Sequence, residues 1–266
     1  MRRAGYLVSA LWIACAACGS DGGSEFPDGG KGGDGAPNGD GGNPFGDATF
    51  DTGGGNDGNC GPNLTGVLRD FHDTHPDFEK FLGDDRGITT NQLGVDEKPV
   101  YASSGTTATT TGKANFDQWY RDVPNVNAKK LFTLTMVQGQ NGISTFDAPT
   151  FFPLDNDGFG NEGRNHNFHF TFELHTTFQY DGGEVFTFTG DDDLWTFING
   201  KLAIDIGGVH GAETATVDLD ADANKLGIVK GKTYPLVVFS AERHTTESHF
   251  RIDTTVQFNN CDPIIR

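Results

Sequence analysis

Two apolar segments joined by the dipeptide Asn199-Gly200 give the clearest pattern of hydrophobic and polar positions in this chain. Both central residues of a type I′ turn need positive φ, which Asn-Gly supplies, so the pattern predicts a β-hairpin. In the register set by that turn Phe197 faces Leu202 and Trp195 faces Ile204, and these four side chains are expected in the core. The opposite face is predicted to be a mixed surface and carries Leu194, Thr196, Ile198, Lys201, Ala203 and Asp205.

A second strand is predicted from the strict alternation between Asn167 and Leu174. The polar positions His169, Glu173 and His175 share one face, and His/Glu sets are common zinc ligands. Ligands on one strand need partners from elsewhere to close a site, so solvent-facing or neighbour-bonded side chains are the favoured interpretation. The apolar face carries Phe168, Phe170, Phe172 and Leu174.

The rest of residues 60–261 is predicted to contain short strands separated by turn residues, with a few helical turns. Such a pattern indicates an all-β sandwich or barrel with short helical turns. Short helices are expected at 75–82 and 116–120, and loops at 102–114 and 242–248. Residues 67–71 are expected to begin the folded part. The other strands expected are residues 131–137, 214–219, 233–239 and 250–252, with a strand pair at 178–188 around Asp181-Gly182-Gly183.

Residues 1–18 have the features of an export signal, with a basic start and an apolar segment too short to span a bilayer. The segment Cys15-Ala16-Ala17-Cys18 resembles a bacterial lipobox, although Cys15 stands where that pattern prefers Leu. The resemblance implies that Cys18 is lipidated and anchors the chain stably in a membrane. The chain is therefore expected to be exported, as an outer-membrane or cell-surface lipoprotein or as a secreted protein, and an ordinary cleaved signal is the alternative.

Residues 19–59 consist mainly of Gly, Asp, Asn and Pro, and they contain too few apolar side chains to fold. They are predicted to form a disordered tether, which as a coil of about 40 residues would reach roughly 35 Å. The folded domain is expected at 60–261. Cys60 and Cys261 bracket it and are predicted to form a disulfide in an oxidising compartment, with two free thiols as the alternative.

The acidic composition excludes some classes of partner. The 266 residues include 19 Lys and Arg against 37 Asp and Glu, which gives a formal net charge of −18. Such a charge repels nucleic acids and anionic lipid surfaces and attracts cations. We therefore expect no nucleic-acid partner and no membrane contact except through the lipid anchor. A need for solubility alone is the alternative explanation of the charge.

Three adjacent carboxylates, Asp191, Asp192 and Asp193, precede the predicted hairpin. Crowded carboxylates repel one another and need a compensating charge, and calcium binds carboxylate and carbonyl oxygens in flexible loops of this kind. A solvated acidic turn is the alternative. Asp155-Asn156-Asp157-Gly158 also begins like a calcium loop, but Phe159 stands where the EF-hand pattern needs its third acidic ligand and His166 where it needs the bidentate Glu. Ordinary turn chemistry is therefore the favoured interpretation, and a calcium site of another type is the alternative.

The segment Gly190 to Gly211 resembles the signature of fibro-slime domains, which belong to the PA14 superfamily of β-sandwich or β-barrel modules. The resemblance covers roughly residues 64–258. Other segments similar to that family are Arg69-Asp70-Phe71, His75-Pro76-Asp77-Phe78, Trp119-Tyr120-Arg121-Asp122 with Asn127, Phe151 to Asp155, Asn167 to Glu173, and Ala241 to Ser248.

The resemblance implies a calcium site. In sugar-binding members of the superfamily two adjacent aspartates, joined by a cis peptide, hold a calcium ion that binds vicinal sugar hydroxyls. By position these are Asp191 and Asp192, with Asp193 beside them where many PA14 domains have Gly. The second ligand loop corresponds to 242–248, which lacks the Asn of the lectin-like members. The ligand-binding residues expected are Trp195, His210, Glu242, Arg243, His244, Glu247 and Ser248.

The sequence therefore predicts a cell-surface-tethered, calcium-dependent carbohydrate-binding or adhesion module whose partner is an extracellular glycan or surface polysaccharide. The alternative is a non-enzymatic structural or extracellular-matrix protein whose acidic loop only stabilises the fold. A hydrolase would need two facing carboxylates about 5–10 Å apart, and no nucleophile-elbow, metallohydrolase or phosphate-loop motif occurs. We therefore expect no enzymatic activity.

Overall fold

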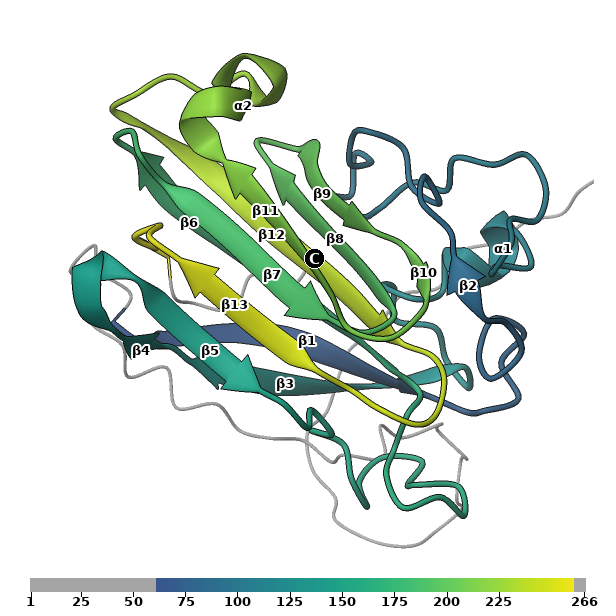
Figure 1. The fold of residues 1–266 in the computed structure, drawn as a ribbon. Coiled ribbons are helices and arrows are strands. Elements are labelled where there is room, and N and C mark those ends of the chain that lie inside the picture. Colours follow the sequence, from purple (N-terminus) through teal and green to yellow (C-terminus); the bar gives the residue numbers. More distant parts are fainter. Residues whose placement is uncertain (1–60, 261–266) are drawn as a thin grey trace, which may run out of the picture. The chain divides into compact units, whose positions relative to one another are not determined.

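Two antiparallel β-sheets make up the body of the domain in the computed structural model, which describes residues 61–260 (Figure 1). The all-β prediction is confirmed, and both larger sheets are open, so the arrangement is a sandwich and not a closed barrel. The first sheet has the order β3 (Asn127–Thr135), β1 (Asn63–Phe71), β6 (Phe170–Tyr180), β12 (Lys232–Glu242), β8 (Asp193–Ile198) and β9 (Lys201–Ile206). The second has the order β11 (Glu213–Asp218), β7 (Val185–Gly190), β13 (Phe250–Thr254), β5 (Ser144–Ala148) and β4 (Val137–Gln138).

Smaller elements complete the described domain. A two-stranded ladder joins β2 (Gly83–Asp84) to β10 (Gly208–Val209). The helical elements are α1 (Lys113–Phe116), the 3₁₀ turn η1 (Gln140–Gly142) and α2 (Leu219–Leu226). In the described part of the chain no helix is long and apolar enough to cross a membrane. The signal, the tether and the cysteines Cys18, Cys60 and Cys261 lie outside the described residues.

The main core lies between the two sheets and follows the predicted alternation. Phe170, Phe172 and Leu174 of β6 all point into it, as the alternating pattern predicts. They meet Phe188 of β7 and Phe250 of β13 from the second sheet, and the last two rings contact each other edge to face with centroids 4.8 Å apart.

A second core covers the outer face of the first sheet. Trp195 and Phe197 of β8 and Phe239 of β12 pack there against Trp119 and Tyr120, which come from the long segment between β2 and β3. The central strands of the first sheet are therefore buried on both faces, and the prediction of a mixed outer surface is wrong for β8. Its residues Leu194, Thr196 and Ile198 are all fully buried.

The hairpin of β8 and β9 keeps only part of its predicted register. Asn199 and Gly200 have φ of 52° and 70°, as a type I′ turn requires, and Phe197 pairs with Leu202. A β-bulge then shifts the pairing, so that Trp195 pairs with Asp205 and not with Ile204. Because of the shift Ile204 joins the core between the sheets, while Trp195 belongs to the second core.

Three other elements differ from the sequence prediction. Residues 75–82 form turns instead of a helix, because Glu79 adopts a φ of 58° that no right-handed helix allows. The strands around Asp181-Gly182-Gly183 follow each other as predicted, but β6 and β7 belong to different sheets. Helix α2 was not predicted, although Asp218 caps its first turn and Gly227 ends it with a φ of 69°.

Candidate functional site

Two loops cross between the sheets at the same end of the sandwich. Asp191-Asp192 links β7 of the second sheet to β8 of the first, and residues 243–249 link β12 of the first sheet to β13 of the second. Gly190 pairs with Phe250, and Asp193 pairs with Ala241, so the strands hold the two loops side by side. This pairing brings the acidic run and the predicted second ligand loop together, as the resemblance implied.

Asp192 is held by backbone N–H groups from both neighbouring segments. Its Oδ2 accepts hydrogen bonds from the backbone of Arg243 at 2.7 Å and His244 at 3.1 Å, and its Oδ1 accepts one from the backbone of His210 at 3.2 Å. The expectation of a cis peptide between Asp191 and Asp192 is wrong, because no peptide bond among the described residues is cis. Asp192 instead turns the chain with a left-handed φ of 47°, which Asp tolerates better than most residues.

Asp193 forms a buried ion pair with Arg243, which differs from its expected role as a metal ligand. Oδ2 of Asp193 lies 2.5 Å from Nε of Arg243, and its Oδ1 accepts a hydrogen bond from the backbone of Gly208 at 2.8 Å. The Arg243 guanidinium also donates to the carbonyl oxygens of Asp77 and Thr109. Both charged side chains are wholly buried, so neither Asp193 nor Arg243 is placed to touch a metal ion or a ligand in the cavity.

Two buried carboxylate oxygens of this region have no hydrogen-bond partner among the described residues, namely Oδ1 of Asp191 and Oε1 of Glu242. The other oxygen of Asp191 lies 2.8 Å from Nδ1 of His249. An unpartnered buried polar atom costs free energy comparable to a lost hydrogen bond, so each of these oxygens needs a further ligand.

Burial disfavours the charged form of these carboxyl groups. It raises the pKa of Asp192 to about 8, against an ordinary value of 3.8. Burial raises the pKa of Glu242 well above its ordinary value too, and the negative charge of Asp192 raises it further. Burial also raises the pKa of Asp191, although the contact with His249 opposes the shift. A cation bound among these groups would reverse the effect, because opposite charge favours the ionised carboxylate.

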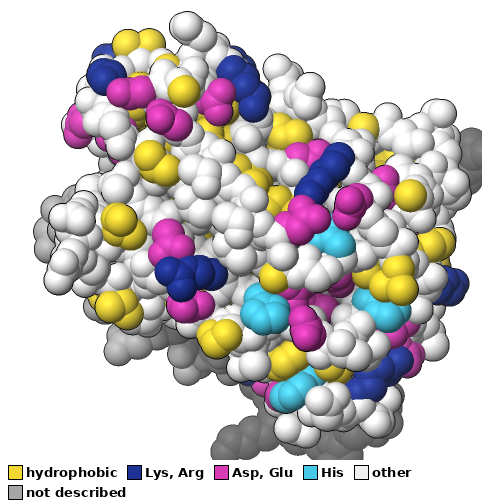
Figure 2. Space-filling view, viewed as in Figure 1, with side chains coloured by type: hydrophobic (Ala, Val, Ile, Leu, Met, Phe, Trp, Pro, Cys, Tyr) yellow, Lys and Arg dark blue, Asp and Glu magenta, His cyan; other side chains and the backbone are white. Residues whose placement is uncertain are grey.

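A cavity of about 150 Å³ lies over the two crossing loops. Among the residues that line it are Asp191, Asp192 and three of the predicted ligand-binding residues, His210, His244 and Glu247. Figure 2 shows carboxylate and histidine side chains gathered together on this face of the molecule. The cavity therefore combines the acidic run with groups that can donate or accept hydrogen bonds.

The other predicted ligand-binding residues do not line the cavity. Trp195 is buried in the second core, where its Nε1 donates to Asp205 at 2.9 Å, so its expected contact with a ligand is ruled out by its position. Glu242 and Ser248 are also buried, and a hydrogen bond from Ser248 lowers the otherwise raised pKa of Glu242.

The side chains of the two other metal sites considered from the sequence are engaged in protein contacts. Asp155 accepts hydrogen bonds from the His166 ring and the Asn167 backbone, and Asp157 pairs with Lys130. The zinc interpretation of His169, Glu173 and His175 is not supported either, because their contacts divide into two separate groups. Glu173 pairs with Arg69, Lys98 and His175, whereas His169 pairs with Glu79 and Glu162.

The sequence interpretation missed His249, Asp84 and Glu213, which complete two groups of neighbouring side chains. One ligand atom each from Asp191, Glu247 and His249 lies within 4.8 Å of the other two, and the same holds for Asp84, His210 and Glu213. His249 follows directly on the predicted ligand loop, so extending that loop by one residue would have included it. Asp84 carries no such signal, because only the short ladder of β2 and β10 brings it to His210.

Residues 147–266 match the PA14 domain family model. The chain is also similar to several proteins of Dictyostelium discoideum. It is 38% identical to psiR over 202 residues, which cover 69% of this chain and 20% of psiR. It is 40% identical to psiJ over 212 residues, which cover 69% of this chain and 29% of psiJ. The chain thus spans less than a third of either relative. Both come from a eukaryote, so they give no support to the bacterial source implied by the lipobox-like segment.

Among solved structures the chain resembles a PA14 sugar-binding domain from an RTX adhesin, with 9% identity and a TM-score of 0.32 over 73% of this chain and 90% of that chain. It also resembles the epithelial adhesin 9 A domain of Candida glabrata in complex with Galb1-3GlcNAc, with 12% identity and a TM-score of 0.31 over 76% of this chain and 93% of that chain.

Proposed function

Because residues 147–266 match the PA14 domain family model, we propose that the chain is a calcium-dependent carbohydrate-binding module that acts in adhesion at a cell surface. The observation that carries the proposal is the surplus of buried acid at the cavity and directly next to it in the chain. Asp191 is 8% exposed, Asp192 4% and Glu242 5%, and the neighbouring Arg243 already neutralises Asp193. Buried carboxylates persist as anions only where a cation or strong hydrogen bonds compensate them.

Asp191 and Asp192 are the residues proposed to hold the ion. Oδ1 of Asp191 is free to coordinate it, and Glu247 on the opposite loop can supply a further oxygen from the same group of neighbouring side chains. His249 would orient Asp191 through the 2.8 Å contact between its ring and Oδ2. A set of carboxylate oxygens on two loops suits calcium, which takes six to eight oxygen ligands in flexible geometry.

The sugar is proposed to enter the cavity above the ion. A bound calcium ion with open coordination positions supplies sites for vicinal sugar hydroxyls. His244 and Glu247 line the same cavity and provide hydrogen-bonding groups of both kinds beside it. At about 150 Å³ the cavity is smaller than the roughly 300–1,000 Å³ of pockets for drug-sized ligands, so it suits a single sugar ring.

We propose further that the domain is of the fibro-slime type. The same proposal places the protein at the cell surface on a lipid anchor at Cys18 and gives it no enzymatic activity. The competing function is structural, with an acidic loop that only stabilises the fold. One observation favours it: Arg243 ties Asp193 to the carbonyl oxygens of Asp77 and Thr109, which joins three distant segments without any ion.

Thermal unfolding of the full chain separates these two functions. Millimolar calcium added to chelator-treated protein is expected to raise the melting temperature, because a ligand that binds only the folded state stabilises it. Asp191→Asn should abolish the rise, and Asp147→Asn should keep it, since Asp147 is an exposed residue of β5. A glycan array with calcium and with chelator then tests the sugar. If calcium leaves the melting temperature unchanged, the structural function is the better account.

A further inference from the structure

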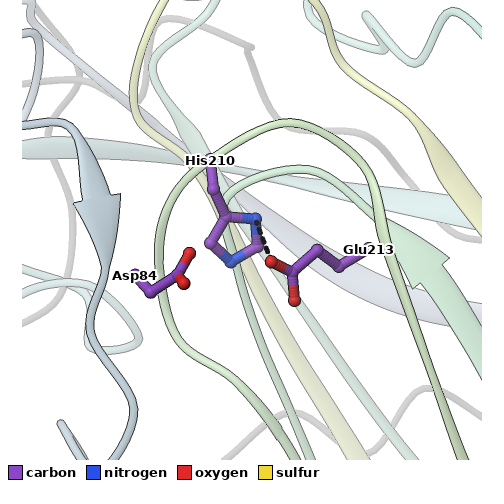
Figure 3. A group of neighbouring side chains, drawn as sticks. All are labelled: Asp84, His210 and Glu213. Atoms are coloured by element: carbon purple, nitrogen blue, oxygen red, sulfur yellow. Dashed lines mark ion pairs between the residues drawn. The ribbon is translucent and has the colours of Figure 1, made fainter.

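Three side chains from three different elements meet at the edge of the domain formed by β2 and β10. Asp84 ends β2, His210 follows β10, and Glu213 begins β11. One ligand atom from each lies within 4.8 Å of the other two. Figure 3 shows the imidazole of His210 lying between the two carboxylates. Exposed acidic groups are common without an ion, so two neighbouring carboxylates alone do not indicate a metal site. The environment of the His210 ring supplies the further observation.

His210 has a ring nitrogen that the rest of the described protein leaves unused. Its side chain is only 8% exposed, and Nε2 is buried without a hydrogen-bond partner among the described residues. Nδ1 lies 2.9 Å from the carbonyl oxygen of Gly211, which can only accept, so Nδ1 carries a proton. In the neutral ring the lone pair is then on Nε2, and in Figure 3 this atom faces the space between Asp84 and Glu213.

Backbone pairing between β2 and β10 holds Asp84 close to the segment that carries His210. Gly208 pairs with Asp84, and Val209 pairs with Gly83, in the ladder of β2 and β10. A Cβ atom on Gly208 would lie 2.5 Å from the carbonyl oxygen of Gly83, so only glycine allows this approach. Asp84 is therefore positioned by backbone pairing, and His210 follows directly on the paired strand β10.

The charges of the cluster are compatible with a bound cation. Glu213 uses Oε2 for an ion pair with Arg86, which leaves Oε1 on the side of the imidazole, 4.0 Å from Nδ1 of His210. Arg86 also donates to the carbonyl oxygen of Asp205 at 3.1 Å, so it holds Glu213 in place from outside the cluster. Asp84 is exposed, and the described structure gives its carboxylate no hydrogen bond or ion pair.

We propose that Asp84, His210 and Glu213 form a zinc site, with Nε2 of His210 and one carboxylate oxygen of each acid as the protein ligands. Zinc accepts imidazole nitrogen together with carboxylate oxygen, and sites with three protein ligands keep a fourth position for water or a ligand. The bond from Nδ1 of His210 to Gly211 is the outer contact that metal-bound histidines usually make. Calcium does not fit here, because it takes oxygen ligands alone.

The zinc site is separate from the proposed calcium site. It shares no ligand with Asp191 or Asp192, although His210 also lines the cavity above them and donates its backbone N–H to Asp192. A zinc ion at this position would place a second cation beside the cavity that we propose for the sugar. The inference holds whether or not calcium binds at Asp191.

Calorimetric titration of the chelator-treated full chain with zinc chloride tests the proposal. We expect one zinc ion per chain, with an affinity weakened roughly 10-fold or more in His210→Gln and in Glu213→Gln. Glu213 is partly exposed, so its variant should fold even if the histidine variant does not. Asp191→Asn should bind zinc as the unaltered chain does, which separates this result from the calcium proposal. Cobalt in place of zinc should give a visible spectrum that His210→Gln loses.

Two matched histidine variants act as controls. His72→Gln should leave zinc binding unchanged, because His72 is about half exposed and pairs with Glu162. His249→Gln should also leave it unchanged, since His249 belongs to the group around Asp191. The proposal is overturned if no zinc binds, if Glu213→Gln and His210→Gln bind as the unaltered chain does, or if His249→Gln alone abolishes binding.

Discussion

Replacing Arg243 by methionine is expected to lower the unfolding free energy by about 3–5 kcal/mol, because it leaves the charge of Asp193 buried and unpaired. The structure supports a loss of this size. The guanidinium is wholly buried, contacts Asp193 at 2.5 Å, donates to the carbonyl oxygens of Asp77 at 3.0 Å and Thr109 at 2.8 Å, and lies 4.6 Å from the centre of the Trp119 ring.

The double variant Asp193→Asn/Arg243→Met isolates the interaction between the two charges. Removing both charges should cost less than the sum of the single losses, with a coupling of about 0.5–3 kcal/mol. Urea unfolding of the full chain, followed by tryptophan fluorescence, measures all three variants. The reasoning is refuted if Arg243→Met loses less than about 1 kcal/mol, as an exposed ion pair would, or if the two single losses simply add.

Three further predictions follow from buried groups. Burial raises the pKa of Asp192 to about 8 and that of Asp70 to about 7, both above the ordinary 3.8, so the folded metal-free chain keeps protons that the unfolded chain releases. The unfolding free energy of the metal-free chain should therefore be highest near pH 4. Each of these two carboxyl groups should lower it by about 1.4 kcal/mol per pH unit as the pH rises toward the pKa of that group in the folded chain. Urea unfolding between pH 4 and 8 measures this decrease, and an unfolding free energy that does not change with pH would contradict it. Gly66→Ala should lower the unfolding free energy by about 1–3 kcal/mol, because the new Cβ would lie 2.5 Å from the carbonyl oxygen of Glu173. An unchanged midpoint of urea unfolding would contradict this, since it would mean that β1 and β6 move apart at no cost. Glu173→Gln should cost about 3–5 kcal/mol, since it removes the buried carboxylate that pairs with Lys98 and Arg69, and in the described structure only Arg69 keeps a second carboxylate partner, Asp122. Thermal unfolding beside the exposed control Asp147→Asn measures the loss, and equal melting temperatures would contradict it.

The sequence predicted those parts of the fold that depend on local rules. Asn199-Gly200 fixed a type I′ turn, and the alternation in β6 assigned Phe170 and Phe172 to the core. It did not predict that β8 is buried on both faces, because the covering layer around Trp119 comes from a segment far away in the sequence. A bulge opposite Thr196 likewise leaves no mark in the hydrophobic pattern.

The candidate site was located but only partly understood from the sequence. Three adjacent acids and a family resemblance pointed to Asp191 and Asp192, which line the cavity. The charge of Asp193 was assigned to a metal, whereas the fold pairs it with Arg243, a residue 50 positions away. Such a pairing depends on which strands are neighbours, and that is set by the whole sheet.

Direct titration of the chelator-treated full chain with calcium, followed by calorimetry, is the measurement that tests the proposed function most directly. The account predicts that the chain binds calcium, that Asp191→Asn and Asp192→Asn lose this binding, and that Asp147→Asn retains it. The absence of calcium binding, or equal binding by the Asp191→Asn variant, would contradict the claim that the buried acids at the crossing loops form a metal site.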